Sequence, residues 1–246
     1  MGASVRIVGI IQARMGSTRL PGKVLRDLGG RSVLGWVVRA VRESRAVDEL
    51  VVATTTEAVD EAVARECQAL GVPCHRGPVD DVLTRFAQVM ADRPDDAMMR
   101  FTADCPLLDP GVIREVAQAF RALPGLDYLS TGLGGTLPRG LDVEIAGPAA
   151  LRRADREATA HHRTHVTSYL YAHPGAGRLL GLAYAPAAAD LRVTLDTEDD
   201  WRLISLVTGE LGDRCVPVRE LVAWLRARPE VCRLNAHVRQ KALREA

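Results

Sequence analysis

The sequence is poor in several features that would identify other classes of protein. Aromatic residues make up only 4% of the 246 residues, too few for the stacked rings that bind single-stranded nucleic acids. Neither sign of charge dominates, because 32 Lys and Arg residues nearly balance 31 Asp and Glu residues and leave a net charge of +1. We therefore do not expect a protein that binds nucleic acid through bulk positive charge.

Cysteines and long apolar runs are also scarce. The five cysteines are odd in number and irregularly spaced, with no CxxC pair, which favours a reduced protein and makes a zinc site improbable. No apolar run has the length of a membrane span, and the N-terminus lacks the pattern of a signal peptide. We expect a soluble, cytoplasmic protein without a membrane segment.

The chain does contain a regular alternation of apolar strands and amphipathic helices. Hydrophobic residues make up 47% of it, enough for a sizeable core. Strands are predicted at 7–11, 49–55, 72–75 and 96–103. Helices are predicted at 32–44, at 57–70, from Asp80 or Asp81 to about residue 90, and at 109–123. This order predicts a single α/β domain over residues 1–246, with a doubly wound, mostly parallel sheet.

The pattern loosens between residues 130 and 178, where a glycine-rich loop precedes a short strand and a helical stretch rich in Arg and His. We expect this segment to form a small inserted lobe over the site, with a dimer contact as a second role. The main fold then resumes with strands LLGLAY and LRVTL and with helices at 198–211 and 218–227. The tail from Asn235 is predicted to be a polar, basic helix on the outside.

The most informative segment follows the first strand. Its loop carries Arg14, Arg19 and Lys23, with no acid before Asp27. Small residues such as Ser17 let the backbone approach a ligand, and exposed N–H groups bind oxyanions. Clustered like charge is unfavourable unless an anion joins it. The spacing matches neither a P-loop nor a dinucleotide fingerprint, but the loop predicts a site for the phosphates of a nucleoside triphosphate.

Two aspartates follow other predicted strands. Asp104 follows 96–103, and Asp196 follows LRVTL. Because the carboxyl ends of parallel strands meet at one edge of a sheet, we expect both beside the basic loop. Magnesium prefers one or two carboxylates together with waters and phosphate oxygens. Both are candidate Mg²⁺ ligands, with a turn aspartate and a helix cap as the respective alternatives. Asp199 and Asp200 are expected to face solvent.

The segment QARMGSTRLPGKVL, residues 12–25, resembles the signature of the SpsF-like branch of the cytidylyltransferase family, which is related to acylneuraminate and 3-deoxy-manno-octulosonate cytidylyltransferases. The resemblance continues in order through residues 76–86, 101–110, 138–145, 161–174 and 192–204. It implies a Rossmann-like three-layer fold of the nucleotide-diphospho-sugar transferase type and a homodimer. It also implies Mg²⁺-dependent transfer of CMP from CTP to an acidic sugar or related small anionic acceptor, with release of pyrophosphate.

The residue patterns and the resemblance together give each candidate residue a role. The catalytic candidates are Arg14, Lys23 and Asp104, and the metal candidates are Asp104 and Asp196. The nucleotide-binding candidates are Ala13, Arg14, Ser17, Arg19, Lys23, Thr54, Arg76, Asp81 and Arg85. The acceptor-binding candidates are Arg139, Asp142, Glu144, Arg163 and His165, all within the expected lobe.

Several points stay open at the level of sequence. No side chain identifies itself as the general base, since a metal-bound water and a carboxylate both suit that role. The residues alone do not separate cytidine from uridine. A glycosyltransferase with a nucleotide-sugar donor and a non-catalytic nucleotide-binding protein are the alternative functions, and release of pyrophosphate would distinguish them.

Overall fold

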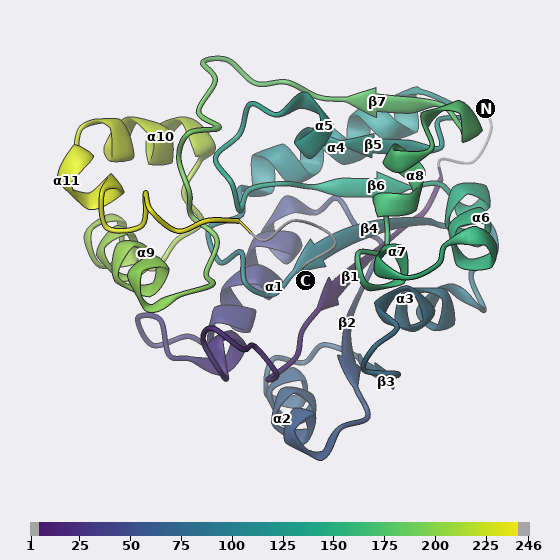
Figure 1. The fold of residues 1–246 in the computed structure, drawn as a ribbon, viewed down its shortest axis with the longest axis horizontal. Helices are drawn as coiled ribbons and strands as arrows, with labels where there is room; N and C mark the ends of the chain where they lie inside the picture. The colour runs from purple at the N-terminus through teal and green to yellow at the C-terminus, as the bar shows by residue number, and fades with distance from the viewer. Residues whose placement is uncertain (1–4, 241–246) are drawn as a thin grey trace.

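A seven-stranded sheet forms the centre of the structure, a computed structural model that describes residues 5–240 (Figure 1). The strands lie in the order β3-β2-β1-β4-β6-β5-β7. They are β1 (Ile7–Gln12), β2 (Glu49–Thr55), β3 (Cys74–Gly77), β4 (Ala97–Thr102), β5 (Tyr128–Ser130), β6 (Glu144–Ala146) and β7 (Leu179–Gly181). β6 is antiparallel to both neighbours and the other pairs are parallel. The predicted α/β fold with a mostly parallel sheet is therefore confirmed.

Helices cover both faces of this sheet. The side chains of β1 alternate, so that Ile7 and Ile11 enter one core and Val8 and Ile10 enter the other. The first core is closed by α1 (Val33–Ser44), α2 (Glu61–Ala69), α4 (Pro110–Ala122), α9 (Glu198–Leu211) and α10 (Val218–Arg226). The second is closed by α3 (Val82–Met90), α6 (Pro148–Glu157) and α8 (Ser168–Ala172). The expected three-layer arrangement is present.

Side-chain caps fix where the main helices begin. The Ser32 hydroxyl accepts from the Gly35 N–H, and the Asp109 carboxylate accepts from the Gly111 N–H, with Pro110 in the first turn of α4. Asp81, one of the two aspartates expected to begin this helix, caps α3 through the Thr84 N–H. The shorter elements are α5 (Thr131–Gly134), α7 (His161–Thr164), α11 (Pro229–Cys232), η1 (Lys23–Leu25), η2 (Ala58–Asp60) and η3 (Pro174–Ala176).

Residues 130–178, the expected inserted lobe, are partly built into the sheet. β6 pairs with β4 on one side and with β5 on the other, so this part of the segment continues the main sheet. α6 and α7 instead pack against α3. The acceptor-binding and dimer roles of the segment stay predictions.

Two expectations about the C-terminal third are wrong. LRVTL, residues 191–195, is extended, but within residues 5–240 its strand pairing is limited to an isolated bridge between Arg192 and Arg139. Its apolar side chains suggested a strand because they are buried, yet they enter the core without sheet pairing. Residues 235–240 are not helical; they turn at Asn235 and run back from the α9–α11 side toward the sheet (Figure 1). The rest of the predicted tail helix, residues 241–246, lies outside the described residues. None of the helices within residues 5–240 has the length and apolar content of a membrane span.

Candidate active site

The basic loop after β1 is held by its own backbone over the edge of the sheet. The Ala13 N–H donates to the Ala53 carbonyl (3.1 Å), and the Met15 N–H donates to an Asp60 carboxylate oxygen (2.7 Å). Gly22 has a φ of 70°, in the left-handed region that favours glycine, and its N–H donates to the Met15 carbonyl. The chain therefore turns back on itself there and brings Lys23 inward.

Lys23 lies at the centre of the site, and only 7% of it is exposed. Its Nζ donates to Asp104 Oδ2 (2.8 Å), to Asp196 Oδ1 (2.8 Å) and to the Leu195 carbonyl (2.6 Å). Burial alone would lower the pKa of Lys23, but the two carboxylates outweigh it and raise that pKa. Burial would also raise the pKa of Asp196, but the adjoining Lys23 ammonium holds it at about 2. Lys23 and Asp196 are therefore both charged at neutral pH.

The two aspartates meet although only one follows a strand of the sheet. Asp104 comes two residues after β4, as expected. Asp196 follows the extended segment 191–195, which is tied to the site by backbone bonds. The Leu195 N–H donates to the Asp104 carbonyl (2.8 Å), and the Val193 N–H donates to the Arg139 carbonyl (2.8 Å). Backbone hydrogen bonds outside the sheet, and not the end of a second sheet strand, thus bring Asp196 to Asp104.

The basic loop has acidic partners that its own sequence does not contain. Lys23 pairs with carboxylates 81 and 173 residues away in sequence. Arg19 Nη2 lies 3.0 Å from Asp196 Oδ2. Among residues 5–240, Arg14 is the cation of the loop for which no ion pair is found. Positive charge without a carboxylate partner is therefore concentrated at Arg14 rather than spread over the loop.

The opposite side of the site contains a second group of charges. Arg100, in β4, donates to Gln12 Oε1 (3.1 Å) and to Glu144 Oε1 (2.8 Å). Glu144 also accepts from the Tyr128 hydroxyl (2.9 Å) and from the Thr167 hydroxyl. Glu144 is consequently held in place by the fold, and little of its hydrogen-bonding capacity is left for a ligand.

Asp142 and Arg139 are more open than Glu144. Both are exposed. Removal of the Asp142 carboxyl from bulk water, and then the nearby Glu144 charge, raise the pKa of Asp142 to about 6 even though part of the residue is exposed. Gly140, between them, has a φ of 102°, and a Cβ there would lie 2.5 Å from the Thr194 backbone nitrogen. The close approach of these two segments requires glycine.

These groups surround one cavity of about 510 Å³ at the carboxyl ends of β1 and β4. Most predicted site residues line it: Ala13, Arg14, Ser17, Arg19, Lys23, Arg85, Asp104, Arg139, Asp142, Glu144, His165 and Asp196. The structure therefore joins the basic loop, both candidate metal ligands and most of the candidate acceptor residues in a single space.

Arg85 differs from the other cavity residues because it is buried and, within residues 5–240, has no carboxylate partner. Only 2% of the residue is exposed, and its Nη1 donates to the carbonyls of Pro78 and Val79. Its Nε has no hydrogen-bond partner among the described residues. Burial and the nearby Arg14 lower the pKa of Arg85. A ligand anion would relieve both effects.

Four predicted site residues do not line the cavity. Arg76 binds the Thr55 and Glu57 carbonyls and Glu61, and thereby braces β3 against α2. Thr54 is buried, and its hydroxyl has no partner in the described part of the chain. Arg163 pairs with both Asp81 and Asp155. The structure thus places Arg163 and Asp81 in a contact between α3, α6 and α7.

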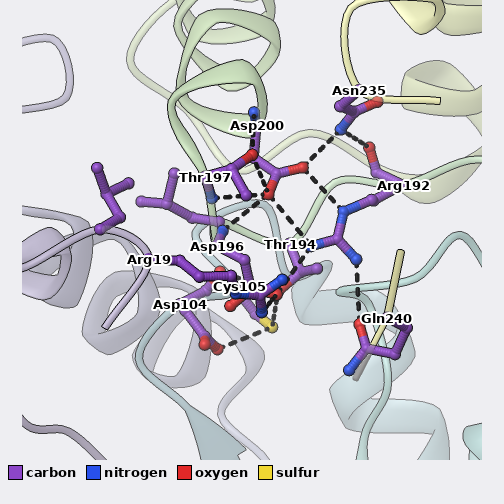
Figure 2. A network of polar contacts seen from close by, with 12 residues as sticks. Arg19, Asp104, Cys105, Arg192, Thr194, Asp196, Thr197, Asp200, Asn235 and Gln240 are labelled. Atoms are coloured by element: carbon purple, nitrogen blue, oxygen red, sulfur yellow. Dashed lines mark hydrogen bonds and ion pairs between the residues drawn. The ribbon is translucent and has the colours of Figure 1, made fainter. Parts of the chain in front are cut away.

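Sequence reasoning also missed residues that form the site. Gln12, Arg100, Arg192 and Gln240 line it or contact its carboxylates. Arg100 and Arg192 each interrupt an apolar segment, which is a usable signal. Asp200 was expected to face solvent but is fully buried. It is the N3 residue of a capping box with Thr197, and it also accepts from Arg192 (2.8 Å), as Figure 2 shows.

Comparison with known proteins identifies the group to which this architecture belongs. Residues 8–198 match the cytidylyltransferase family. The chain belongs to the cytidylyltransferase family. The enzymes of this family are CTP-dependent nucleotidyltransferases, and the match covers the basic loop, Asp104 and Asp196.

Individual relatives agree with this assignment. The spore coat polysaccharide biosynthesis protein SpsF of Bacillus subtilis is 35% identical over 91% of this chain and 95% of its own length. The 3-deoxy-manno-octulosonate cytidylyltransferase of Bdellovibrio bacteriovorus is 32% identical over 50% of this chain and 49% of its own. A cytidylyltransferase structure from Leptospira borgpetersenii shares the fold, with a TM-score of 0.89 and 24% identity over 97% of this chain and 99% of that one.

Proposed function

We propose that this cytidylyltransferase moves CMP from CTP to an acidic sugar or a related small anionic acceptor, in a Mg²⁺-dependent reaction that releases pyrophosphate. One observation carries the proposal. Two carboxylates from distant segments converge on a single cationic nitrogen beside a basic loop, inside a cavity large enough for a nucleotide. The family supplies CMP transfer, while the metal and the acceptor class are the proposed parts.

The oxygen atoms that surround Lys23 Nζ are of the kind that bind a hard cation. Two carboxylate oxygens and one carbonyl oxygen lie within 2.8 Å of this one point. Oxygen ligands of this kind are those that Mg²⁺ prefers. No cluster of three or more His, Cys, Asp or Glu side chains suited to a metal occurs among the described residues. Because Mg²⁺ needs only one or two protein carboxylates, Asp104 and Asp196 would hold the ion, and phosphate oxygens and water would be its other ligands.

The chain's own residues would divide the reaction between them. Arg14 and Arg19 would bind the β- and γ-phosphates, joined by the Lys23 ammonium once it leaves the carboxylates. Their charge would offset the negative charge that grows on pyrophosphate as it leaves. Bound magnesium would make the α-phosphorus more electrophilic. Because such a transfer needs little covalent chemistry from the protein, positioning and electrostatics provide most of the catalysis.

The acceptor would enter from the side of Arg139 and Asp142. Arg139 is exposed and without an ion pair among the described residues, so it can bind a carboxylate or phosphonate. Asp142, with a pKa of about 6, is a suitable acceptor for the proton of the attacking hydroxyl. Relatives named for spore coat polysaccharide biosynthesis and for 3-deoxy-manno-octulosonate support an acidic sugar destined for a polysaccharide. A homodimer is part of the same proposal.

A pyrophosphate-release assay tests this function. CTP, UTP, ATP and GTP are each combined with Mg²⁺ and a panel of acid sugars and phosphonates, and nucleotide sugars without triphosphate form a control arm. We expect release with CTP and an anionic acceptor, abolished by EDTA, and at least a hundredfold slower in Asp104→Asn. Turnover that survives EDTA, or an Asp104→Asn variant with near-normal turnover in saturating Mg²⁺, would refute the proposal.

A further inference from the structure

The C-terminal segment reaches the candidate active site, although it lies outside the part of the chain that matches the family. The family match ends at residue 198, before most of α9. After α11 the chain turns, with the Val238 N–H donating to the Asn235 carbonyl (3.0 Å). It then places Gln240 in the lining of the same cavity as Lys23. Figure 2 shows Asn235 and Gln240 on either side of the Arg192 side chain.

Asn235 is joined to Asp196 through one buried carboxylate. Only 2% of Asn235 is exposed, and its Nδ2 donates to Asp200 Oδ1 (2.8 Å) and to the Arg192 carbonyl (3.2 Å). The other Asp200 oxygen accepts from the Asp196 N–H and the Thr197 N–H, both at 2.9 Å. Asp200 thus connects the C-terminal segment to the backbone of a candidate metal ligand.

Gln240 is joined to Asp196 through Arg192. Its Oε1 accepts from Arg192 Nη1 (3.1 Å), while Arg192 Nη2 donates to Asp196 Oδ2 (2.8 Å). The Asp196 carboxylate therefore offers Oδ1 to Lys23. Its Oδ2 is fixed by Arg19 and Arg192 (Figure 2). Asn235 and Gln240 are therefore both connected to Asp196, the first to its backbone through Asp200 and the second to its side chain through Arg192.

We propose that residues 235–240 belong to the active site, where Asn235 and Gln240 are positioning residues that orient Asp196 toward its cation. The proposal depends on the metal role given to Asp196 above. Groups that hydrogen-bond a metal ligand set its direction and change metal affinity by about tenfold or more when removed. In this chain the groups bonded to Asp196 include Arg192 and Asp200. Gln240 and Asn235, from the segment beyond the family match, hold these two groups in turn, so the cation affinity would depend on residues 235–240.

Isothermal titration with CTP and Mn²⁺ tests the proposal without an acceptor. Two quantities are measured: the Mn²⁺ concentration that gives half-maximal CTP binding, and the CTP dissociation constant at saturating Mn²⁺. We expect Asn235→Ala to raise the Mn²⁺ midpoint about tenfold and Gln240→Ala about threefold, with the CTP constant at saturating Mn²⁺ within twofold of wild type. Gln118→Ala, at an exposed position in α4, is the matched control and should change neither.

The outcomes separate this proposal from the proposed function. If Mn²⁺ does not promote CTP binding to the wild-type chain, the metal site itself is refuted. If wild type requires Mn²⁺ but both variants keep its midpoint within twofold, residues 235–240 have no positioning role. Equal losses in both quantities would indicate general distortion and would also overturn the inference. Because Gln240 is exposed, Gln240→Ala should fold normally even if Asn235→Ala lowers the melting temperature.

Discussion

The two ends of the cavity differ in how firmly their charged groups are held. At the phosphate end, Lys23 is buried, and its Nζ donates hydrogen bonds of 2.8 Å to the carboxylates of Asp104 and Asp196. At the acceptor end, Arg139 and Asp142 are exposed. The difference indicates that the fold assembles the charges of the phosphate end in advance, so that the proposed chemistry there needs only the transfer of Lys23 from the carboxylates to phosphate. The acceptor end instead leaves room for its ligand to form the missing contacts.

The largest effect is expected at the phosphate end, in Lys23→Ala. This change removes a cation from the proposed leaving group and leaves the Asp104 and Asp196 carboxylates facing each other. We expect turnover to fall by about two orders of magnitude or more at saturating CTP and Mg²⁺. The measurement is steady-state pyrophosphate release, with circular dichroism to confirm folding. A folded variant with wild-type turnover would show that the buried ammonium serves the fold alone.

At the acceptor end, Arg139→Ala should act on one substrate only. Loss of a charge-assisted hydrogen bond to an anionic acceptor is expected to raise the acceptor KM about tenfold, with the CTP KM within twofold. Initial rates with each substrate varied in turn give both constants. Equal increases in the two constants would remove the distinction between the ends of the cavity.

The proton-acceptor role of Asp142 predicts a particular pH profile. A carboxyl with a pKa of about 6 is protonated below that pH and cannot then accept a proton. Wild-type kcat/KM for the acceptor should therefore fall as the pH decreases through about 6. In Asp142→Asn the rate should be lower and this decline should disappear. A decline that persists unchanged in the variant would assign the titration to another group.

The smallest effect on activity is expected for Arg163→Ala. Arg163 pairs with Asp81 and Asp155, and it is absent from the cavity lining. The loss should cost about 1–2 kcal/mol of unfolding free energy, reduced by the partial exposure of these pairs, and leave the acceptor KM within twofold. Denaturant unfolding and initial rates measure the two quantities. An acceptor KM that rises as in Arg139→Ala would restore Arg163 to the acceptor site.

The sequence predicted local structure better than long-range pairing. Caps such as Ser32 and Asp109 were predictable because they bond to N–H groups two or three residues ahead. The meeting of Asp104 and Asp196 was expected from strand ends, and it occurs, but through backbone bonds outside the sheet. The prediction for Asp200 was wrong because an acid in the first turn of a helix normally faces water. Only the fold reveals its bonds to Arg192 and Asn235.

The tail was misplaced for a related reason. Its composition is polar and basic, which suggested an external helix, and composition carries no information about a specific buried partner. Asn235 finds that partner 35 residues earlier in the chain. For Glu144, a predicted acceptor residue, the sequence indicated the right place but not the full role. Glu144 lines the cavity, and it also accepts hydrogen bonds from Arg100 and Tyr128 that stabilise the fold.

Gly140 has a practical consequence for altering this enzyme. Because its Cα hydrogen faces the Thr194 backbone, any side chain at this position must separate the Arg139 loop from the segment that ends at Asp196. Substitution there would widen the gap between the two ends of the cavity instead of changing the surface offered to an acceptor. Libraries that seek new acceptors should keep this glycine and vary Arg139 and Asp142 on either side of it.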